Sequence, residues 1–475
     1  MEDYTNLDRY QDILGQLPML QVYAHVLYFF PTPSCSRQEL VDSLSAAITK
    51  VRQAVPWMGA CVVNTGRIPG RSSGLYHVVA CPPPSPPIVV KDVQSQAPSY
   101  SAFAARSVPL SMIDASLFTP VPGFPTQFED SDEDPAHVVR LQVSFIAGGV
   151  VLDFVTHHNM VDAGGHFGFV RLMAMALRGE EFPAALLKEV NRDRRPGILF
   201  PLLGSDEPML DHAHHRRRPI TAADPLVQTA KAARTHIFRF TGDKLRQLKE
   251  LASQAEGFDR TVPYITTDDA LCAFCWQRVL CARLRLHTQS AFHSLSGETP
   301  SRFSRTVDGR RALGLSPNYM GDVIHNIATT LPVATVASAP LSTIACALRS
   351  RILAANANNS SGYHIRSFAT FIANEPDKST ITYGGEFNPV TDFSVSSILA
   401  RRGEMFVDFG VLGRPGFVRR PPSVTFVGVG VFFPSSGDQE IGQGDGCDAS
   451  IGLTDEEFGI LEEDAMWKEF VQYIG

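Results

Sequence analysis

The stretch that constrains the fold most is a predicted β-hairpin that ends on two histidines, "VVRLQVSFIAGGVVLDFVTHH". Apolar residues alternate with Arg140 and Gln142 in its first half, which is the period of a strand with one buried face. An Ala-Gly-Gly sequence at residues 147–149 supplies the turn. The second strand therefore ends at His157 and His158, and strand alternation directs the two imidazoles to opposite faces.

The residues after the histidines predict either a helix cap or the neighbourhood of a catalytic base. Asp162 can cap the helix that begins "AGGHFGFVRLMAMAL", with Gly164 and Gly165 allowing close backbone approach and Gly179 ending the helix. A half-buried histidine at a strand end is also well placed to be a neutral general base near pH 7. The hairpin alone leaves both interpretations open.

The rest of the chain predicts two halves that each mix strands with helices. Residues 19–30 are strand-like and precede a helix with a capping box at Ser36 and Glu39. After a polar, proline-punctuated stretch the pattern restarts, and residues 454–474 are predicted to close the chain as one amphipathic helix. We therefore predict an α/β protein with an N-terminal domain, an interdomain crossover and a C-terminal domain, at residues 1–204, 205–235 and 236–475.

Composition excludes several classes of function. Hydrophobic residues make up 44 % of the 475 residues and charged residues 19 %, which is typical of a globular protein. The net charge of -7 disfavours nucleic acid as a partner. The N-terminus is acidic, unlike a signal peptide, and no run approaches the roughly 18 apolar residues that span a bilayer. The eight scattered cysteines predict free thiols in a cytoplasmic protein.

Two further patterns are interpreted as structural. Cys272 and Cys275 have CxxC spacing, but they lie in a helix-like run without a second ligand pair, so we expect them in the core. His212, His214 and His215 resemble a metal-binding tract, but no carboxylate or cysteine frame accompanies them. We predict a charged, exposed loop there and no metal site.

Common catalytic motifs are missing from the sequence. There is no GxSxG elbow for a hydrolase triad, no HExxH pair for zinc and no GxxxxGK[ST] phosphate loop. A DFG triplet occurs at residues 408–410, but the glycine loop, VAIK lysine and HRD of protein kinases do not.

Four motifs in order carry a family resemblance. Residues 158–162 read HNMVD, and residues 408–415 read DFGVLGRP. Between them lie "TTDDALCAFCWQRV" and "TVDGRRALGLSPNYMGD". With its HxxxD motif, its helix with an acidic start and a tryptophan, its VDxR stretch and its loose DFGWG motif, the chain resembles the BAHD-type acyl-CoA-dependent acyltransferases. The fungal branch, which includes the trichothecene O-acetyltransferases, is the most similar, and the resemblance covers most of the chain.

The resemblance implies a fold and a reaction. The fold would be two similar chloramphenicol-acetyltransferase-like domains, each a mixed β-sheet flanked by helices, with the active-site channel between them. The reaction would move an acyl group, acetyl by expectation, from acyl-CoA to a hydroxyl or amine of a small-molecule acceptor, a fungal secondary metabolite. Acyl-CoA is then a co-substrate, and we expect a monomer with no bound cofactor, metal, nucleic acid or membrane span.

The resemblance also assigns roles to five residues. His158 would be the general base that takes the acceptor's proton during attack on the thioester, without an acyl-enzyme. Asp162 would face away from the substrate and hold the loop through Arg310, the matching family position. Asp408 and Gly410 would shape the loop near the CoA channel. No residue is assigned to CoA binding.

The sequence departs from the family pattern at three places. Ala163 stands where the family usually has glycine, and Val411 and Leu412 replace the tryptophan of DFGWG. Asp322 replaces the usual asparagine after the Tyr-x-Gly turn. The proposed base is untouched, but the donor and acceptor become harder to infer.

Two alternatives from other classes are kept. Nonribosomal-peptide condensation domains share a two-lobed fold and an HHxxxD motif, so a carrier-protein-bound donor is the first alternative. A catalytically idle binding protein that keeps the fold is the second, although the intact His158 and Asp162 argue against it.

Overall fold

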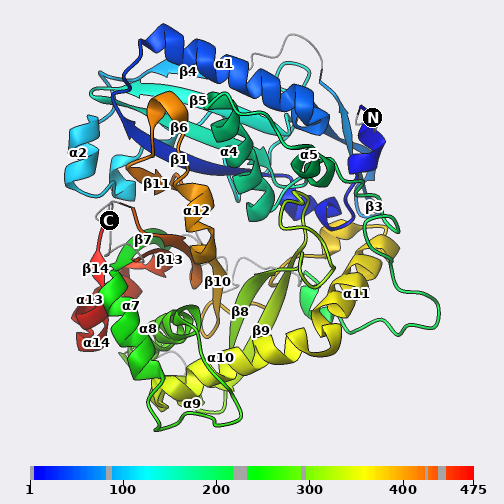
Figure 1. Ribbon diagram of the computed structural model, residues 1–475. Helices are drawn as coiled ribbons and strands as arrows, with labels where there is room; N and C mark the ends of the chain where they lie inside the picture. The colour runs from blue at the N-terminus through cyan, green and yellow to red at the C-terminus, as the bar shows by residue number, and fades with distance from the viewer. Residues whose placement is uncertain (1–4, 82–87, 218–232, 290–295, 423–425, 437–445) are drawn as a thin grey trace.

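Two large β-sheets and one short hairpin form the framework in the computed structural model, which describes residues 5–81, 88–217, 233–289, 296–422, 426–436 and 446–475 (Figure 1). The strands are β1 (Tyr23–Pro31), β2 (Ala60–Ile68), β3 (Ser72–Ala80), β4 (Val89–Asp92), β5 (Val139–Ile146), β6 (Gly149–His157), β7 (Ala233–Phe240), β8 (Pro300–Asp308), β9 (Ile324–Pro332), β10 (Phe393–Ser397), β11 (Phe417–Arg419), β12 (Val429–Pro434), β13 (Cys447–Thr454) and β14 (Gln472–Tyr473). The first sheet has the order β11-β1-β6-β5-β4 and the second β14-β7-β13-β12-β10-β8-β9, while β2 and β3 form a separate hairpin. Both large sheets mix parallel and antiparallel pairs, as the sequence predicts.

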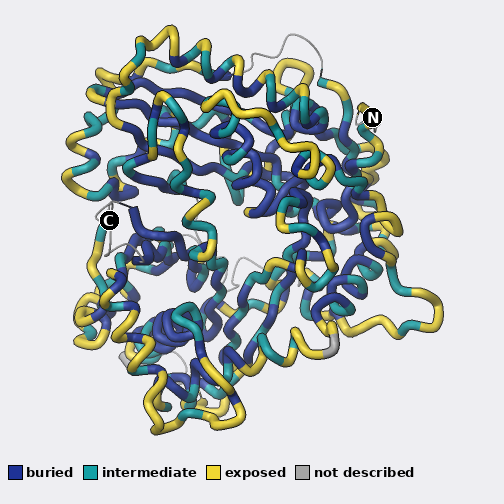
Figure 2. Tube along the Cα trace, in the orientation of Figure 1, coloured by how far each residue is buried: buried dark blue, intermediate teal, exposed yellow. Residues whose placement is uncertain are grey.

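Helices pack against both large sheets. They are α1 (Arg37–Ala54), α2 (Tyr100–Ala105), α3 (Ala115–Phe118), α4 (Ala163–Leu177), α5 (Ala184–Val190), α7 (Gly242–Ala252), α8 (Thr267–Gln289), α9 (Val333–Ser338), α10 (Leu341–Asn356), α11 (Ser360–Asn374), α12 (Arg402–Met405), α13 (Asp455–Glu463) and α14 (Ala465–Phe470). Leu44 of α1 and Phe169 of α4 share one apolar core with Phe154 of β6. Trp276 of α8 anchors the core of the second sheet, and Figure 2 shows the buried path of the central strands. Among the described residues, no helix has both the length and the apolar character needed to cross a bilayer.

Segments distant in sequence join the two halves. Leu14 and Leu17, near the N-terminus, pack in one cluster with Tyr319 and Val323 of the second half. In the other direction, β11 comes from the C-terminal half and pairs antiparallel with β1. The predicted division at residues 204 and 235 stays a prediction, and residues 218–232 of the crossover lie outside the described part of the chain.

Short-range sequence signals are confirmed. The predicted hairpin is formed by β5 and β6, and its turn lies between Ile146 and Gly149. Ser36 accepts a hydrogen bond from the amide of Glu39, whose side chain accepts one from the Ser36 amide, which is the predicted capping box of α1. Cys272 and Cys275 are fully buried in α8, as expected for core residues.

The prediction of one closing helix over residues 454–474 is wrong. The segment forms α13, α14 and the short strand β14. Asp464 adopts an extended backbone (φ -69°, ψ 117°), and its carboxylate accepts a hydrogen bond from the Trp467 amide at 2.8 Å. Aspartate competes for local amide groups as an N-cap, so it ends one helix and begins the next.

The prediction of eight free thiols is wrong for Cys61 and Cys81, which form a disulfide with their Cα atoms 5.1 Å apart. Cys61 lies in β2 and Cys81 directly follows β3, so the antiparallel pairing of these strands brings the two side chains together. His137 Nδ1 lies 3.1 Å from the Cys81 sulfur. The other six cysteines are free.

The prediction of an exposed, charged loop at the histidine tract is also wrong. His212 and His215 are only 2 % and 3 % exposed, because this part of the crossover packs against α11. His212 Nε2 lies 2.9 Å from Ser367 Oγ, and the His215 ring packs 4.5 Å from the Phe368 ring. Burial, together with the neighbouring histidines, lowers the pKa of His212 to about 4 and that of His215 to about 3. Both imidazoles are therefore neutral at neutral pH.

These two histidines should make the fold sensitive to acid. Their native pKa values lie below the roughly 6.5 of an unfolded histidine, so the unfolded state binds more protons as the pH falls from about 6.5 toward 4. Each should then remove about 1.4 kcal/mol of stability per pH unit in this window. Urea unfolding at about pH 7, 6 and 5 should show a smaller loss in the double variant His212→Gln, His215→Gln than in the wild type. Equal pH slopes in the two proteins would contradict this account.

Candidate active site

His158 is the first residue after β6, at the end of the first sheet. Its amide donates to the carbonyl of Val22 at 2.9 Å, so the backbone is fixed where the strand ends. The side chain is 24 % exposed, and Nδ1 is its buried nitrogen and makes no hydrogen bond. Burial lowers the pKa of His158 below its usual 6.5, and the positive charge of Arg420 acts in the same direction. The imidazole is therefore neutral and partly accessible at neutral pH.

His157 has no such access. It is 1 % exposed and packs edge-to-face on the Tyr23 ring, with the ring centroids 5.0 Å apart. Burial lowers the pKa of His157 to about 3, so it is a neutral core residue. Of the two histidines, only His158 is accessible to solvent.

The turn that follows His158 is held from several sides. The side-chain Nδ2 of Asn159 donates to the carbonyl of Leu17 at 3.2 Å, and Arg194 donates to the carbonyl of Met160 at 2.7 Å. Arg194 is 1 % exposed and comes from the segment after α5. These bonds leave the His158 backbone little freedom.

Asp162 forms a buried ion pair that joins the two halves of the chain. Arg310, from the segment after β8, donates from Nη1 to Oδ2 at 2.9 Å and from Nη2 to Oδ1 at 2.7 Å. The Asp162 carboxylate also accepts from the amides of Gly165 and Val323 at 3.0 and 3.2 Å, the first of these as the N-cap of α4. Burial alone would raise the pKa of Asp162, but Arg310 and these amides outweigh it and hold the pKa below its usual value. Asp162 is thus ionised and fully engaged.

Gly164 and Gly165 are required where the start of α4 packs against Arg310 and Met320. A Cβ on Gly164 would lie 2.8 Å from the Arg310 guanidinium, and one on Gly165 would lie 2.1 Å from the carbonyl oxygen of Met320. The start of α4 can therefore dock on residues 310–320 only with glycine at both positions. Ala163, the departure from the family pattern, is exposed and disturbs neither contact.

Asp322 lies behind His158. Its Oδ2 is 3.9 Å from His158 Nδ1, which is too long for a hydrogen bond, and neither atom has another partner among the described residues. The side chain is fully buried, and burial together with the charges of Asp162 and Asp12 raises the pKa of Asp322 well above its usual value. A carboxyl group is therefore held beside the ring nitrogen that the solvent does not reach.

Asp12 and Tyr319 fix the backbone around Asp322. The Asp12 carboxylate accepts from the Tyr319 hydroxyl at 3.2 Å and from the Asp322 amide at 3.0 Å. Burial raises the pKa of Asp12 to about 6, against the opposing charge of Arg194. The N-terminal segment thus contributes directly to the wall behind His158.

The predicted DFG loop packs on the first sheet, away from His158. Phe409 is fully buried against the rings of Tyr28 and Phe30, with centroids 5.6 and 5.4 Å away. Asp408 is exposed, accepts from the amide of Gly410 at 2.8 Å, and its carbonyl accepts from Arg178. Gly410 has a φ of +65°, and a Cβ there would lie 2.9 Å from the Leu177 carbonyl oxygen. The loop therefore packs the C-terminal half of the chain against the end of α4.

Sequence reasoning assigned no role to Asp12, Arg194 or Asp322. Asp322 had a signal, because it was a departure from the family asparagine. The other two had none, because their positions relative to His158 depend on contacts between segments far apart in the chain.

Comparisons with known proteins agree on the type of protein. The trichothecene 3-O-acetyltransferase-like N-terminal domain matches residues 22–189, and the Transferase family matches residues 124–467. The O-acetyltransferase epaC of Aspergillus niger is 51 % identical over 476 residues, which cover 100 % of this chain and 98 % of the relative. The O-acyltransferase pigD of Monascus ruber is 40 % identical, covering 98 % of this chain and 99 % of the relative.

A solved structure extends the agreement to the fold. The trichothecene 3-O-acetyltransferase of Fusarium sporotrichioides, crystallised with coenzyme A and T-2, superposes with a TM-score of 0.83 at 29 % identity, over 98 % of this chain and 99 % of that one. The predicted α/β architecture of mixed sheets flanked by helices is thereby confirmed.

Replacing Asp162 by asparagine should destabilise the fold by about 3 to 5 kcal/mol, because the buried Arg310 charge loses its partner. Asparagine keeps an acceptor oxygen for the N-cap, while the ion pair and the acceptor for the Val323 amide are lost. Asp308→Asn is the matched control, since Asp308 also accepts from Arg310, at 3.0 Å, but is 43 % exposed. It should cost less than about 1 kcal/mol. Chemical denaturation measures both, and equal losses would show that the ion pair is not what holds the halves together.

Proposed function

The chain belongs to the Transferase family, the BAHD-type acyl-CoA-dependent acyltransferases, and from this premise we propose how its residues carry out the transfer. It is an acyl-CoA-dependent O-acyltransferase with fungal relatives. We propose acetyl-CoA as the donor, a hydroxyl of a small secondary metabolite as the acceptor and the cytoplasm as the location. The observation that carries the mechanism is the neutral, partly accessible imidazole of His158 with the Asp322 carboxyl behind it.

His158 acts as the general base in this proposal. Nδ1 is buried toward Asp322, so Nε2 is the nitrogen left for the acceptor. Nε2 takes the proton of the acceptor hydroxyl while the oxygen attacks the thioester carbonyl. The tetrahedral oxyanion then collapses, the carbon–sulfur bond breaks, and the CoA thiolate takes the proton back from Nε2. The products are the ester and CoA, and the transfer needs no acyl-enzyme.

Asp322 positions the base. A hydrogen bond from Nδ1–H to the Asp322 carboxyl would fix the tautomer in which Nε2 is free, and would stabilise the imidazolium formed during attack. The two atoms need to approach by about 1 Å, as catalytic hydrogen bonds do when substrates close a site. Asp162, Arg310, Asp408 and Gly410 support the site structurally, because they hold the segments that carry His158 and Asp322 together.

The relatives support the choice of substrates. The Fusarium sporotrichioides relative was crystallised with coenzyme A and T-2, and a Fusarium graminearum relative with coenzyme A and deoxynivalenol. Coenzyme A as the leaving group and a hydroxylated small molecule as the acceptor follow for this chain by similarity. No observation favours a carrier-protein-bound donor or an idle binding protein.

His158→Ala should lower acyl transfer by about 10²- to 10⁴-fold, the usual contribution of a general base. His158→Gln, which keeps polarity but takes no proton at neutral pH, should lose as much. Release of CoA thiol from acetyl-CoA, measured with a panel of hydroxylated acceptors that includes deoxynivalenol, reports the loss. CoA affinity and the unfolding midpoint should stay close to those of the wild type. Near-normal transfer in either variant would remove His158 as the base.

Asp322→Ala should lower kcat at least tenfold with little change in KM, because the base loses its orienting group. Asp322→Asn should recover part of the activity, since its amide oxygen accepts from Nδ1–H. The acid limb of the kcat/KM profile should stay at the wild-type pH in Asp322→Asn, because burial already favours the uncharged form of the Asp322 carboxyl and asparagine is uncharged too. A shifted acid limb in Asp322→Asn, or no recovery by asparagine, would contradict the positioning role.

A further inference from the structure

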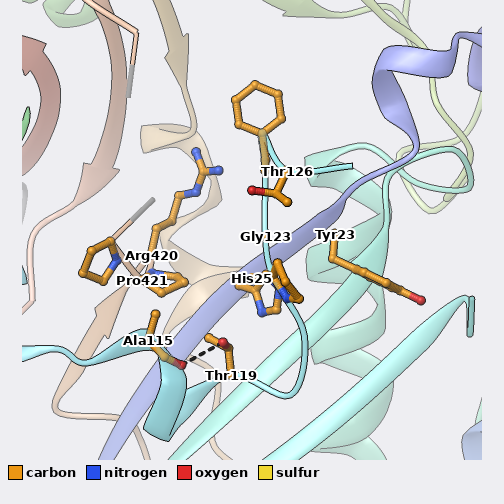
Figure 3. A pocket seen from close by; sticks show the side chains of 11 residues that line it. Tyr23, His25, Ala115, Thr119, Gly123, Thr126, Arg420 and Pro421 are labelled. Atoms are coloured by element: carbon orange, nitrogen blue, oxygen red, sulfur yellow. Dashed lines mark hydrogen bonds between the residues drawn. The ribbon is translucent and has the colours of Figure 1, made fainter. Parts of the chain in front are cut away.

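A cavity of about 220 Å³ lies beside the start of β1. Its walls are Tyr23 and His25 of β1, the loop around Phe124, and the segment that follows β11 (Figure 3). The rings of Tyr23 and Phe124 and the prolines at residues 421 and 422 make most of this wall apolar. Against that background, one ring nitrogen of His25 and the guanidinium of Arg420 have no partner among the described residues.

The first of these is the imidazole of His25. Its Nδ1 lies 2.7 Å from Oδ2 of Asp153, and both side chains are almost fully buried. Nε2 makes no hydrogen bond, although His25 lines the cavity. Gly123 is required at this contact, since a Cβ there would lie 2.7 Å from Cδ2 of His25. The carboxylate orients the ring, and Nε2 is left as the ring nitrogen without a partner.

The second is the guanidinium of Arg420. It is half-buried at the cavity and makes no hydrogen bond or ion pair with the described residues. The preceding Arg419 shows the contrast, because it pairs with Asp448 at 3.0 Å and donates to the carbonyl of Val108 at 3.0 Å. A guanidinium is always charged, and a half-buried guanidinium without a partner favours an anionic ligand that offsets its partial desolvation. Within the described residues the protein supplies none.

The cavity is close to the proposed base. The carbonyl of Val22 holds the His158 amide, and His25 lies three residues farther along the chain, about 10 Å from Val22. Arg420 is near enough for its charge to act on His158. A rigid multi-ring acceptor anchored in this cavity would have to extend about that far to place its hydroxyl at His158, whereas the phosphates of CoA are separated from its thioester by the long pantetheine arm.

We propose that His25 and Arg420 bind an anionic oxygen group of the acceptor, a carboxylate or an enolate carried on an apolar ring system, and thereby orient the acceptor hydroxyl toward His158. This rests on the proposed function, because it names the acceptor class for that site. Arg420 provides the charge and a two-pronged donor, and His25 provides a second N–H when the anion is present. A phosphate of CoA has the same chemistry, and the test separates the two sources.

Equilibrium binding tests the inference without any turnover. Naphthoate and its methyl ester serve as probes in NMR titrations, and CoA binding is followed by calorimetry. Naphthoate should bind the wild type, and its affinity should fall at least tenfold in Arg420→Gln but much less in Arg420→Lys. The methyl ester should bind the wild type and Arg420→Gln equally. The CoA affinity of Arg420→Gln should differ less than twofold from that of the wild type. Arg106→Gln, which removes an exposed arginine outside the cavity, is the control and should bind naphthoate like the wild type.

Other outcomes would overturn the inference. Equal naphthoate affinity in the wild type and Arg420→Gln, or no binding to the wild type, shows that the cavity does not select anions. A loss of CoA affinity with unchanged naphthoate binding assigns Arg420 to the donor phosphates. His25→Phe with Asp153→Leu, which removes the dyad without leaving a buried carboxylate, should also weaken naphthoate binding. Failure of the proposed function would appear separately, as a wild type that binds naphthoate but releases no CoA thiol.

Discussion

The ion pair of Asp162 and Arg310 is the interaction on which the site depends. Each partner comes from a different half of the chain, and each is buried, so neither half can leave the other without exposing or stranding a charge. Arg310 also donates to the carbonyls of Tyr319 and Gly321, at 2.8 and 3.1 Å, which carries the constraint to the segment before Asp322. The carboxylate that caps α4 thus also fixes, through Arg310, the segment that holds Asp322 beside His158.

Asp12, Asp162 and Asp322 lie close together, but their different surroundings shift their pKa values in different directions. Asp162 has a bidentate arginine and stays ionised, whereas burial raises the pKa of Asp12 to about 6 and that of Asp322 well above its usual value. A compact site holds three carboxyl groups because only one of them must carry its full charge. Asp322 is the one next to His158, and its raised pKa keeps a second full negative charge out of the site.

Sequence reasoning succeeded where the signal was local. The hairpin, the capping box of α1 and the Asp162 cap each involve residues within a few positions of one another, and the ordered motifs add the family fold. It failed where distant segments meet. The pairing of Cys61 with Cys81 follows from strand register, and the burial of His212 follows from contact with α11. The positions of Asp322, His25 and Arg420 are likewise products of packing between elements, which one sequence does not display.

The central claim is that His158 is a neutral base whose free nitrogen faces the acceptor. Nitrogen-15 NMR of histidine-labelled protein observes this state directly, with the resonance assigned by its loss in His158→Gln. The account predicts a neutral ring at neutral pH that carries its proton on Nδ1, and a pKa below 6.5. A protonated ring at neutral pH, or a neutral ring with its proton on Nε2, would contradict it.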